Sequence, residues 1–162
     1  IVLADRHARA SGVDPSCRQS KAQLTMSDDD SRGIVTSAYQ ALARGDDDAF
    51  IQRLEDHVEW IVPDPTDHPS TGTHIGKEAL LLMFARFARF GAFAELLSLE
   101  IEQVVGDGEV VVVLGRERWK VKASGREFET IWANAVTVDD GLITRVIVYA
   151  DTSNETAAFS GA

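Results

Sequence analysis

The stretch Tyr39-Gln-Ala-Leu-Ala-Arg-Gly-Asp46 marks the end of one helix and the start of another. Apolar residues before and within it recur with the 3.6-residue period of an amphipathic helix, which predicts a helix from about residue 28 to residue 44. Those residues are Val35, Ala38, Tyr39 and Leu42. The Tyr39 ring should therefore point inward. Gly45 ends this helix, and Asp46 can cap a short second helix through its side-chain oxygen.

After the second helix the pattern changes to that of a strand. Residues 58–62 alternate between the two faces, with Trp60 on the apolar side. Prolines at positions 63, 65 and 69 predict an irregular loop, which we expect to rim a pocket. Gly76-Lys-Glu78 begins a third predicted helix, which ends near Gly91. Its apolar face, which should cover one side of a sheet, consists of Leu80, Met83, Phe84 and Phe87.

The remainder of the chain is typical of an antiparallel sheet. Four β-like segments are separated by turn sequences that contain glycine. These segments cover about 93–105, 109–122, 127–138 and 142–150. Helices that come first and strands that follow indicate an α+β fold, in which the helices pack on one concave face of the sheet.

The length of 162 residues fits one folded domain, over residues 26–162, with an apolar content of 44% that suffices for a core. Residues 1–25 lack periodicity and are predicted to form a disordered extension. No apolar run approaches the roughly 20 residues of a membrane span. The single cysteine, Cys17, cannot form an intrachain disulfide, so we expect a cytoplasmic protein.

The formal net charge of −10 disfavours two classes of partner. Nucleic acids and anionic membrane surfaces both require a clustered basic face. We therefore expect neither a nucleic-acid partner nor a membrane partner. No glycine-rich phosphate loop, Ser-His-Asp order or Cys-His pair is present, which makes nucleotide cofactors and covalent catalysis poor hypotheses.

Together with Val58-Glu-Trp60 and Thr71-Gly-Thr-His-Ile-Gly-Lys-Glu-Ala79, this order of elements resembles the nuclear transport factor 2-like superfamily over residues 30–152. It is most similar to the branch of ketosteroid isomerases and SnoaL-type polyketide cyclases. The resemblance implies a cone-shaped α+β barrel, with three N-terminal helices packed on a curved, mainly antiparallel sheet around one pocket. It further implies a small apolar ligand, no cofactor, no metal, and a homodimer formed through the outer face of the sheet.

The catalytic positions of these relatives are only partly matched. The first-helix tyrosine of the isomerases falls on Ala38 by distance from Gly45, with Tyr39 one residue away. The isomerase base falls on Ile61 or Val62, which cannot accept a proton. The second oxyanion donor falls on Asn134, and the acid that cyclases carry on the final strand falls on Val148. Asparagine can donate a hydrogen bond but cannot transfer a proton.

Strand alternation identifies further candidates. In residues 110–122, Glu117 shares a face with Trp119, where loss of water would raise its pKa toward the range of a general base. The alternative is a glutamate that pairs with a neighbouring arginine. Asn134 lies on the inward face of residues 127–138 and either binds a polar atom of a ligand or satisfies backbone groups or water. The opposite face of residues 110–122 forms a basic row that should meet solvent or a partner subunit; it consists of Arg116, Arg118, Lys120 and Lys122.

Other side chains are candidates for the pocket wall: Trp60, Phe84, Trp119, Trp132, Val148 and His74. Each tryptophan can line an aromatic cavity for a flat polycyclic or terpenoid molecule or belong to an ordinary core. His68 and His74 lie near Asp64 and Asp67, but their spacing matches no metal motif and solvated loop residues are favoured. His57 is interpreted as a surface residue and Asp151 as a capping or subunit-contact residue.

Two hypotheses for function follow. The first is a cofactor-independent isomerase, cyclase or hydratase that acts on an apolar carbonyl, hydroxyl or epoxide compound. In it Glu117 moves a proton while Tyr39 and Asn134 hold the developing oxyanion. The second is a non-catalytic ligand-binding or dimeric interaction module, which the missing family acids favour. The direction of the Glu117 carboxylate distinguishes them: an inward acid favours catalysis, and an outward ion pair favours binding alone.

Overall fold

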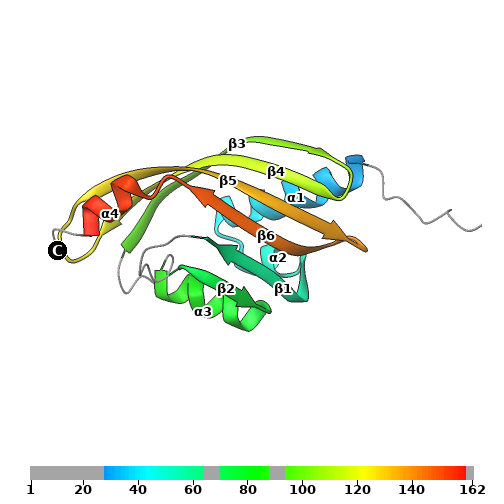
Figure 1. Ribbon diagram of the computed structural model, residues 1–162, viewed down its shortest axis with the longest axis horizontal. Coiled ribbons are helices and arrows are strands. Elements are labelled where there is room, and N and C mark those ends of the chain that lie inside the picture. The colour runs from blue at the N-terminus through cyan, green and yellow to red at the C-terminus, as the bar shows by residue number, and fades with distance from the viewer. Residues whose placement is uncertain (1–27, 64–69, 88–93, 160–162) are drawn as a thin grey trace, which may run out of the picture.

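The computed structural model describes residues 28–63, 70–87 and 94–159, which form four helices and one six-stranded sheet (Figure 1). The helices are α1 (Asp28–Arg44), α2 (Asp47–Ile51), α3 (Lys77–Phe87) and α4 (Ser153–Phe159). The strands are β1 (Leu54–Val62), β2 (Gly72–Ile75), β3 (Ala94–Asp107), β4 (Val110–Val121), β5 (Glu127–Asp139) and β6 (Leu142–Ala150). The extension predicted at residues 1–25, the prolines 65 and 69, and His68 lie outside the described residues.

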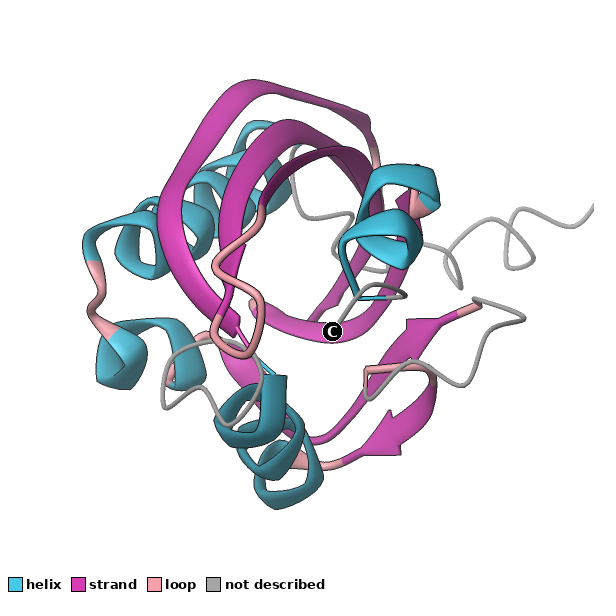
Figure 2. Cartoon of the chain, turned by 90° about the vertical axis from the view of Figure 1, so that its left-hand side faces the viewer, coloured by secondary structure: helices cyan, strands magenta, loops and turns pink. Residues whose placement is uncertain are grey.

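The sheet has the strand order β2-β1-β6-β5-β4-β3. Adjacent strands in the sheet run antiparallel, except that β1 and β6 run parallel to each other. The long strands β3 to β6 arch over α1 and α2, and Figure 2 shows how strongly they curl. This confirms the predicted α+β architecture with a curved, mainly antiparallel sheet.

The predicted boundaries agree closely with the observed ones for α1 and for the four long strands. The side chain of Asp46 caps α2, because its Oδ1 accepts a hydrogen bond from Ala49 N at 3.1 Å. The β5–β6 turn is also confirmed. Asp140 and Gly141 have φ angles of 46° and 80°, the positive pair that a tight two-residue hairpin turn requires.

Two elements were not predicted. The short strand β2 pairs with β1 at the edge of the sheet, where the motif at residues 71–76 was interpreted as a loop. The strand consists of Gly72-Thr-His-Ile75 and shows no alternation of apolar and polar residues. Hydrophobic periodicity therefore cannot detect this strand. The C-terminal helix α4 follows the last strand at one end of the curl (Figure 1). The helices are therefore not all N-terminal.

The main core lies between the sheet and the helices α1 and α3. Its largest fully buried side chains include Tyr39, Phe50, Leu54 and Leu80. A smaller apolar cluster joins α4 to the ends of β4 and β5 through Trp119, Phe128 and Ala158. No helix among the described residues is long and apolar enough to traverse a bilayer.

Candidate functional site

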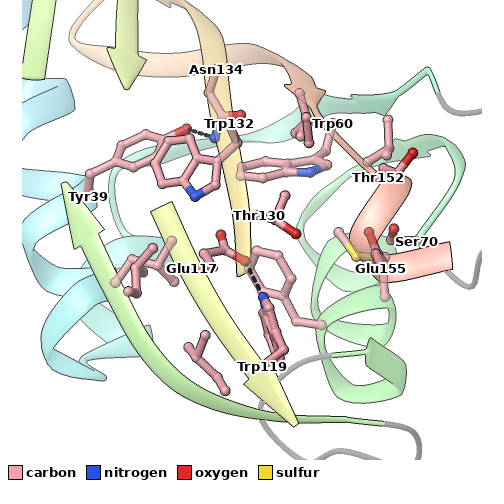
Figure 3. A pocket seen from close by; sticks show the side chains of 18 of the residues that line it. Tyr39, Trp60, Ser70, Glu117, Trp119, Thr130, Trp132, Asn134, Thr152 and Glu155 are labelled. Atoms are coloured by element: carbon pink, nitrogen blue, oxygen red, sulfur yellow. Dashed lines mark hydrogen bonds between the residues drawn. The ribbon is translucent and has the colours of Figure 1, made fainter. Parts of the chain in front are cut away.

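A pocket of about 180 Å³ lies between the inner face of the sheet and the helices α1, α3 and α4 (Figure 3). Eight of the nine candidate residues contribute to its wall. They are Tyr39, Trp60, Phe84, Glu117, Trp119, Trp132, Asn134 and Val148. Trp60 and Trp132 also belong to the main core, so for them the cavity and core interpretations both apply.

Glu117 extends from β4 into this pocket, on the same face as Trp119. Its Oε2 accepts a hydrogen bond from Trp119 Nε1 at 2.7 Å, which confirms the face predicted from alternation (Figure 3). Burial raises the pKa of Glu117 to about 7, and the negative charge of Glu155 adds to the rise while the Trp119 bond opposes it. The carboxyl group therefore gains and loses its proton much closer to neutral pH than an ordinary glutamate does.

The alternative of a glutamate paired with a neighbouring arginine is wrong. Arg116 forms an ion pair with Glu102, and Arg118 forms one with Glu127 at 2.9 Å. Both arginines lie on the outer face of β4, as the alternation predicted. Among the described residues Glu117 has no hydrogen-bond or ion-pair partner except Trp119.

Tyr39 and Asn134 meet deep in the pocket although 95 residues separate them along the chain. Asn134 Nδ2 donates a hydrogen bond to Tyr39 Oη at 2.9 Å, and both side chains are buried. Burial raises the pKa of Tyr39 above its ordinary value, against the smaller lowering effect of the Asn134 bond. The phenol therefore keeps its proton at neutral pH, and that O–H remains available to donate to a ligand.

The inner face of β5 presents three polar atoms that no described residue satisfies. They are Thr130 Oγ1, Trp132 Nε1 and Asn134 Oδ1. Because residues two apart in a strand share a face, these groups follow one another at steps of roughly 7 Å along the pocket wall. Buried polar atoms normally have partners. Three such atoms in a row, in a cavity, indicate a place where a ligand or water completes the hydrogen bonds.

The position of the Trp132 ring depends on Gly115, its cross-strand partner on β4. A Cβ atom at Gly115 would lie 2.4 Å from the indole ring and 2.6 Å from the Glu100 carbonyl oxygen. The absent side chain thus makes room for the indole to lie flat against β4. Tyr39 packs beside the same indole, with ring centroids 6.0 Å apart.

Trp60 and Phe84 close the other side of the pocket. Their rings meet edge to face with centroids 5.6 Å apart, and Phe50 contacts both from the core. This geometry is favourable for aromatic pairs and holds large side chains in fixed positions. The wall formed by α3 and β1 is therefore aromatic and apolar.

The pocket residues in α4 and immediately before it were not predicted from the sequence. Glu155 is buried and lines the pocket together with Thr152. A signal was present, since the polar run Asp151-Thr-Ser-Asn-Glu155 is typical of a helix start, and Asp151 Oδ1 accepts a hydrogen bond from Ser153 N at 3.0 Å. This bond confirms the capping interpretation of Asp151.

His74 is the candidate that the pocket does not include. It lies opposite Trp60, but on the edge strand β2, and its Nε2 is 2.9 Å from the backbone oxygen of Ser70. The assignment of His74 to the ligand wall was therefore wrong in position. His57 is exposed, as expected. Within the described ranges, no three His, Cys, Asp or Glu side chains come together in a way that could hold a metal ion.

Comparison with known proteins identifies the family to which this architecture belongs. Residues 35–146 match the SnoaL-like domain. The chain belongs to the SnoaL-like domain family. A search of curated proteins finds no match to the chain.

Solved structures agree with that assignment. An NTF2-like protein from Burkholderia xenovorans LB400 is 31% identical over 82% of this chain and 98% of its own, with a TM-score of 0.69. A candidate SnoaL-like polyketide cyclase from Mesorhizobium loti is 19% identical over 72% of this chain and 96% of its own, with a TM-score of 0.61. A candidate isomerase from Rhodopseudomonas palustris is 17% identical over 80% and 94%, with a TM-score of 0.62. The last two show only that the SnoaL-like fold is shared.

Proposed function

We propose that this SnoaL-like protein is a cofactor-independent acid/base enzyme. Its substrate is a small, largely apolar molecule that bears a carbonyl, hydroxyl or epoxide group, and its reaction is an isomerisation, cyclisation or hydration. The observation that carries the proposal is the half-buried, inward Glu117, whose pKa of about 7 suits both uptake and release of a proton at neutral pH.

The other polar groups supply the remaining parts of such a reaction. Tyr39 O–H and the unpaired Trp132 Nε1 are two donors that can stabilise negative charge on a substrate oxygen. Asn134 Nδ2 donates a hydrogen bond to the Tyr39 hydroxyl oxygen, so Asn134 acts as a positioning residue for that phenol. This differs from the expectation that Asn134 itself holds the oxyanion. The aromatic wall excludes water, which strengthens these interactions.

A ligand-binding module without catalysis is the second candidate, and Val148 favours it. Val148 lies directly opposite Asn134 on β6, inside the pocket, at the position where the resemblance to cyclases implies an acid. Val62, one of the two positions for the isomerase base, also lines the pocket. Under this alternative the cavity holds a ligand, and Glu117 takes no part in a reaction.

Hydrogen exchange in D₂O separates the two candidates. A panel of small cyclic ketones is incubated with the protein, and deuterium uptake at the carbon next to the carbonyl is followed by NMR. A general base should accelerate uptake for a ketone that binds, and Glu117→Gln should lower the rate by about 10²- to 10⁴-fold. Glu129→Gln, an exposed change on β5, is the matched control and should leave the rate unchanged. Binding without any Glu117-dependent uptake would favour the module.

A further inference from the structure

The charges around the pocket are all of one sign. Three carboxylates line it, Asp47, Glu117 and Glu155, and the described lining residues include no lysine, arginine or histidine. The same wall carries six aromatic rings: Tyr39, Trp60, Phe84, Trp119, Phe128 and Trp132. Aromatic faces attract cations, and a tryptophan face does so most strongly. The described wall therefore favours positive charge both through its carboxylates and through its rings.

Hydrogen-bond acceptors point to the same conclusion. Thr130 Oγ1 and Asn134 Oδ1 are buried without partners, and both side chains are more than nine-tenths buried. The Thr130 hydroxyl is directed into the space beside the Glu117 carboxyl group (Figure 3). A protonated amine donates up to three hydrogen bonds and accepts none, so it can satisfy a carboxylate and a neighbouring hydroxyl oxygen together.

We propose that the ligand of this pocket carries a positively charged amine, held between Glu117, Thr130 and the tryptophan rings. This inference rests on the proposed function in that it names the substrate class of the same site. Anionic compounds such as carboxylates or phosphate esters are poor ligands, because no described cation in the wall would compensate their loss of water. The net charge of −10 also raises the local concentration of cations near the protein.

A cationic ligand would also prepare Glu117 for chemistry. An adjacent ammonium favours the ionised form of a carboxyl group, so binding would convert protonated Glu117 into the carboxylate that can remove a proton. Tyr39 O–H and Trp132 Nε1 would remain available to donate to an oxygen elsewhere on the ligand. The expected substrate thus combines an amine with a carbonyl or hydroxyl oxygen.

Three probes of nearly equal size test the charge preference. They are 2-phenylethylamine, 2-phenylethanol and phenylacetate, which present a cation, a neutral group and an anion on one scaffold. Affinities are measured by tryptophan fluorescence at pH 8, where the amine is still protonated. The amine should bind at least about tenfold more tightly than the alcohol, and phenylacetate more weakly than either. Equal or tighter binding of the alcohol, or no binding of the amine, would overturn the inference.

Variants assign the preference to Glu117. Glu117→Gln should bring the amine and the alcohol close to equal affinity, whereas Glu129→Gln should keep the difference. A preference that survives Glu117→Gln contradicts the proposed position of the charge. The deuterium exchange assay is independent of this order of affinities, so loss of the cation preference and loss of catalysis can be told apart.

If Glu117→Gln does not fold, the affinity of the unmodified protein for the amine can be measured as a function of pH instead. Amine affinity should fall several-fold from pH 8 to pH 6 as Glu117 becomes protonated, while alcohol affinity stays level. The other titratable groups that face the pocket are Tyr39 on α1, Asp47 on α2 and Glu155 on α4. A pH-independent amine affinity would contradict the contact with Glu117.

Discussion

Glu117→Gln should change how the stability of the fold depends on pH. An unfolded glutamate titrates near pH 4.5, whereas Glu117 in the folded protein has a pKa of about 7. Below pH 4.5 both states hold the proton, and the folded state bears no penalty. As the pH rises toward 7 only the unfolded state ionises, so stability falls; above pH 7 the loss is complete. Each pKa unit of difference corresponds to about 1.4 kcal/mol, so the full loss amounts to roughly 3–4 kcal/mol.

Glutamine cannot ionise, so the variant should be free of this loss. Urea unfolding of both proteins at pH 5, 6, 7 and 8 measures the difference in the free energy of unfolding between them. The difference should shift in favour of Glu117→Gln by up to about 3 kcal/mol between pH 5 and pH 8. Glu129→Gln, the exposed control, should remain parallel to the unmodified protein. Parallel curves for Glu117→Gln would refute the reasoning, because they would mean that the folded and unfolded carboxyl groups have the same pKa.

Three further outcomes are expected. Gly115→Ala should lower the free energy of unfolding by about 1–3 kcal/mol and alter the fluorescence of Trp132, since the new methyl group meets the indole ring at 2.4 Å; an unchanged stability would contradict the close packing. An alkaline absorbance titration should show the Tyr39 phenol, assigned by its absence in Tyr39→Phe, ionising only above the ordinary pKa of tyrosine or on unfolding; ionisation of this phenol at the ordinary pKa would contradict its burial. We also expect two copies to pair through the outer sheet face, where Ile131 is 61% exposed, so that light scattering gives twice 17.7 kDa and Ile131→Glu gives the monomer; a monomer before mutation would contradict this.

Hydrophobic periodicity and turn residues were sufficient to predict most of the helices and strands of the fold. The 3.6-residue stripe that contains Tyr39 predicted α1, and the Asp-Gly turn at residues 139–141 predicted the β5–β6 hairpin. Alternation along β4 and β5 placed Glu117 and Asn134 on the inner face. These signals succeed because each long element buries one face and leaves the other in water.

The sequence was less informative where contacts depend on distant segments. The bond between Asn134 and Tyr39 joins β5 to α1, and neither residue predicts the other. The role of Gly115 becomes visible only when Trp132 lies across it. Glu155 was missed because a seven-residue helix has too few positions to show a period. His74 was misplaced because its motif gave no sign that it lies on an edge strand.

A direct measurement of the Glu117 protonation state tests the central claim most closely. The ¹³C resonance of its side-chain carboxyl group, assigned by its absence in Glu117→Gln, can be followed by NMR from pH 4 to pH 9. A midpoint close to pH 7 is expected, because the carboxyl group lies in the pocket with little solvation and has only an indole N–H as partner among the described residues. A midpoint near 4.5, the value of an ordinary glutamate, would contradict the acid/base role proposed for this pocket.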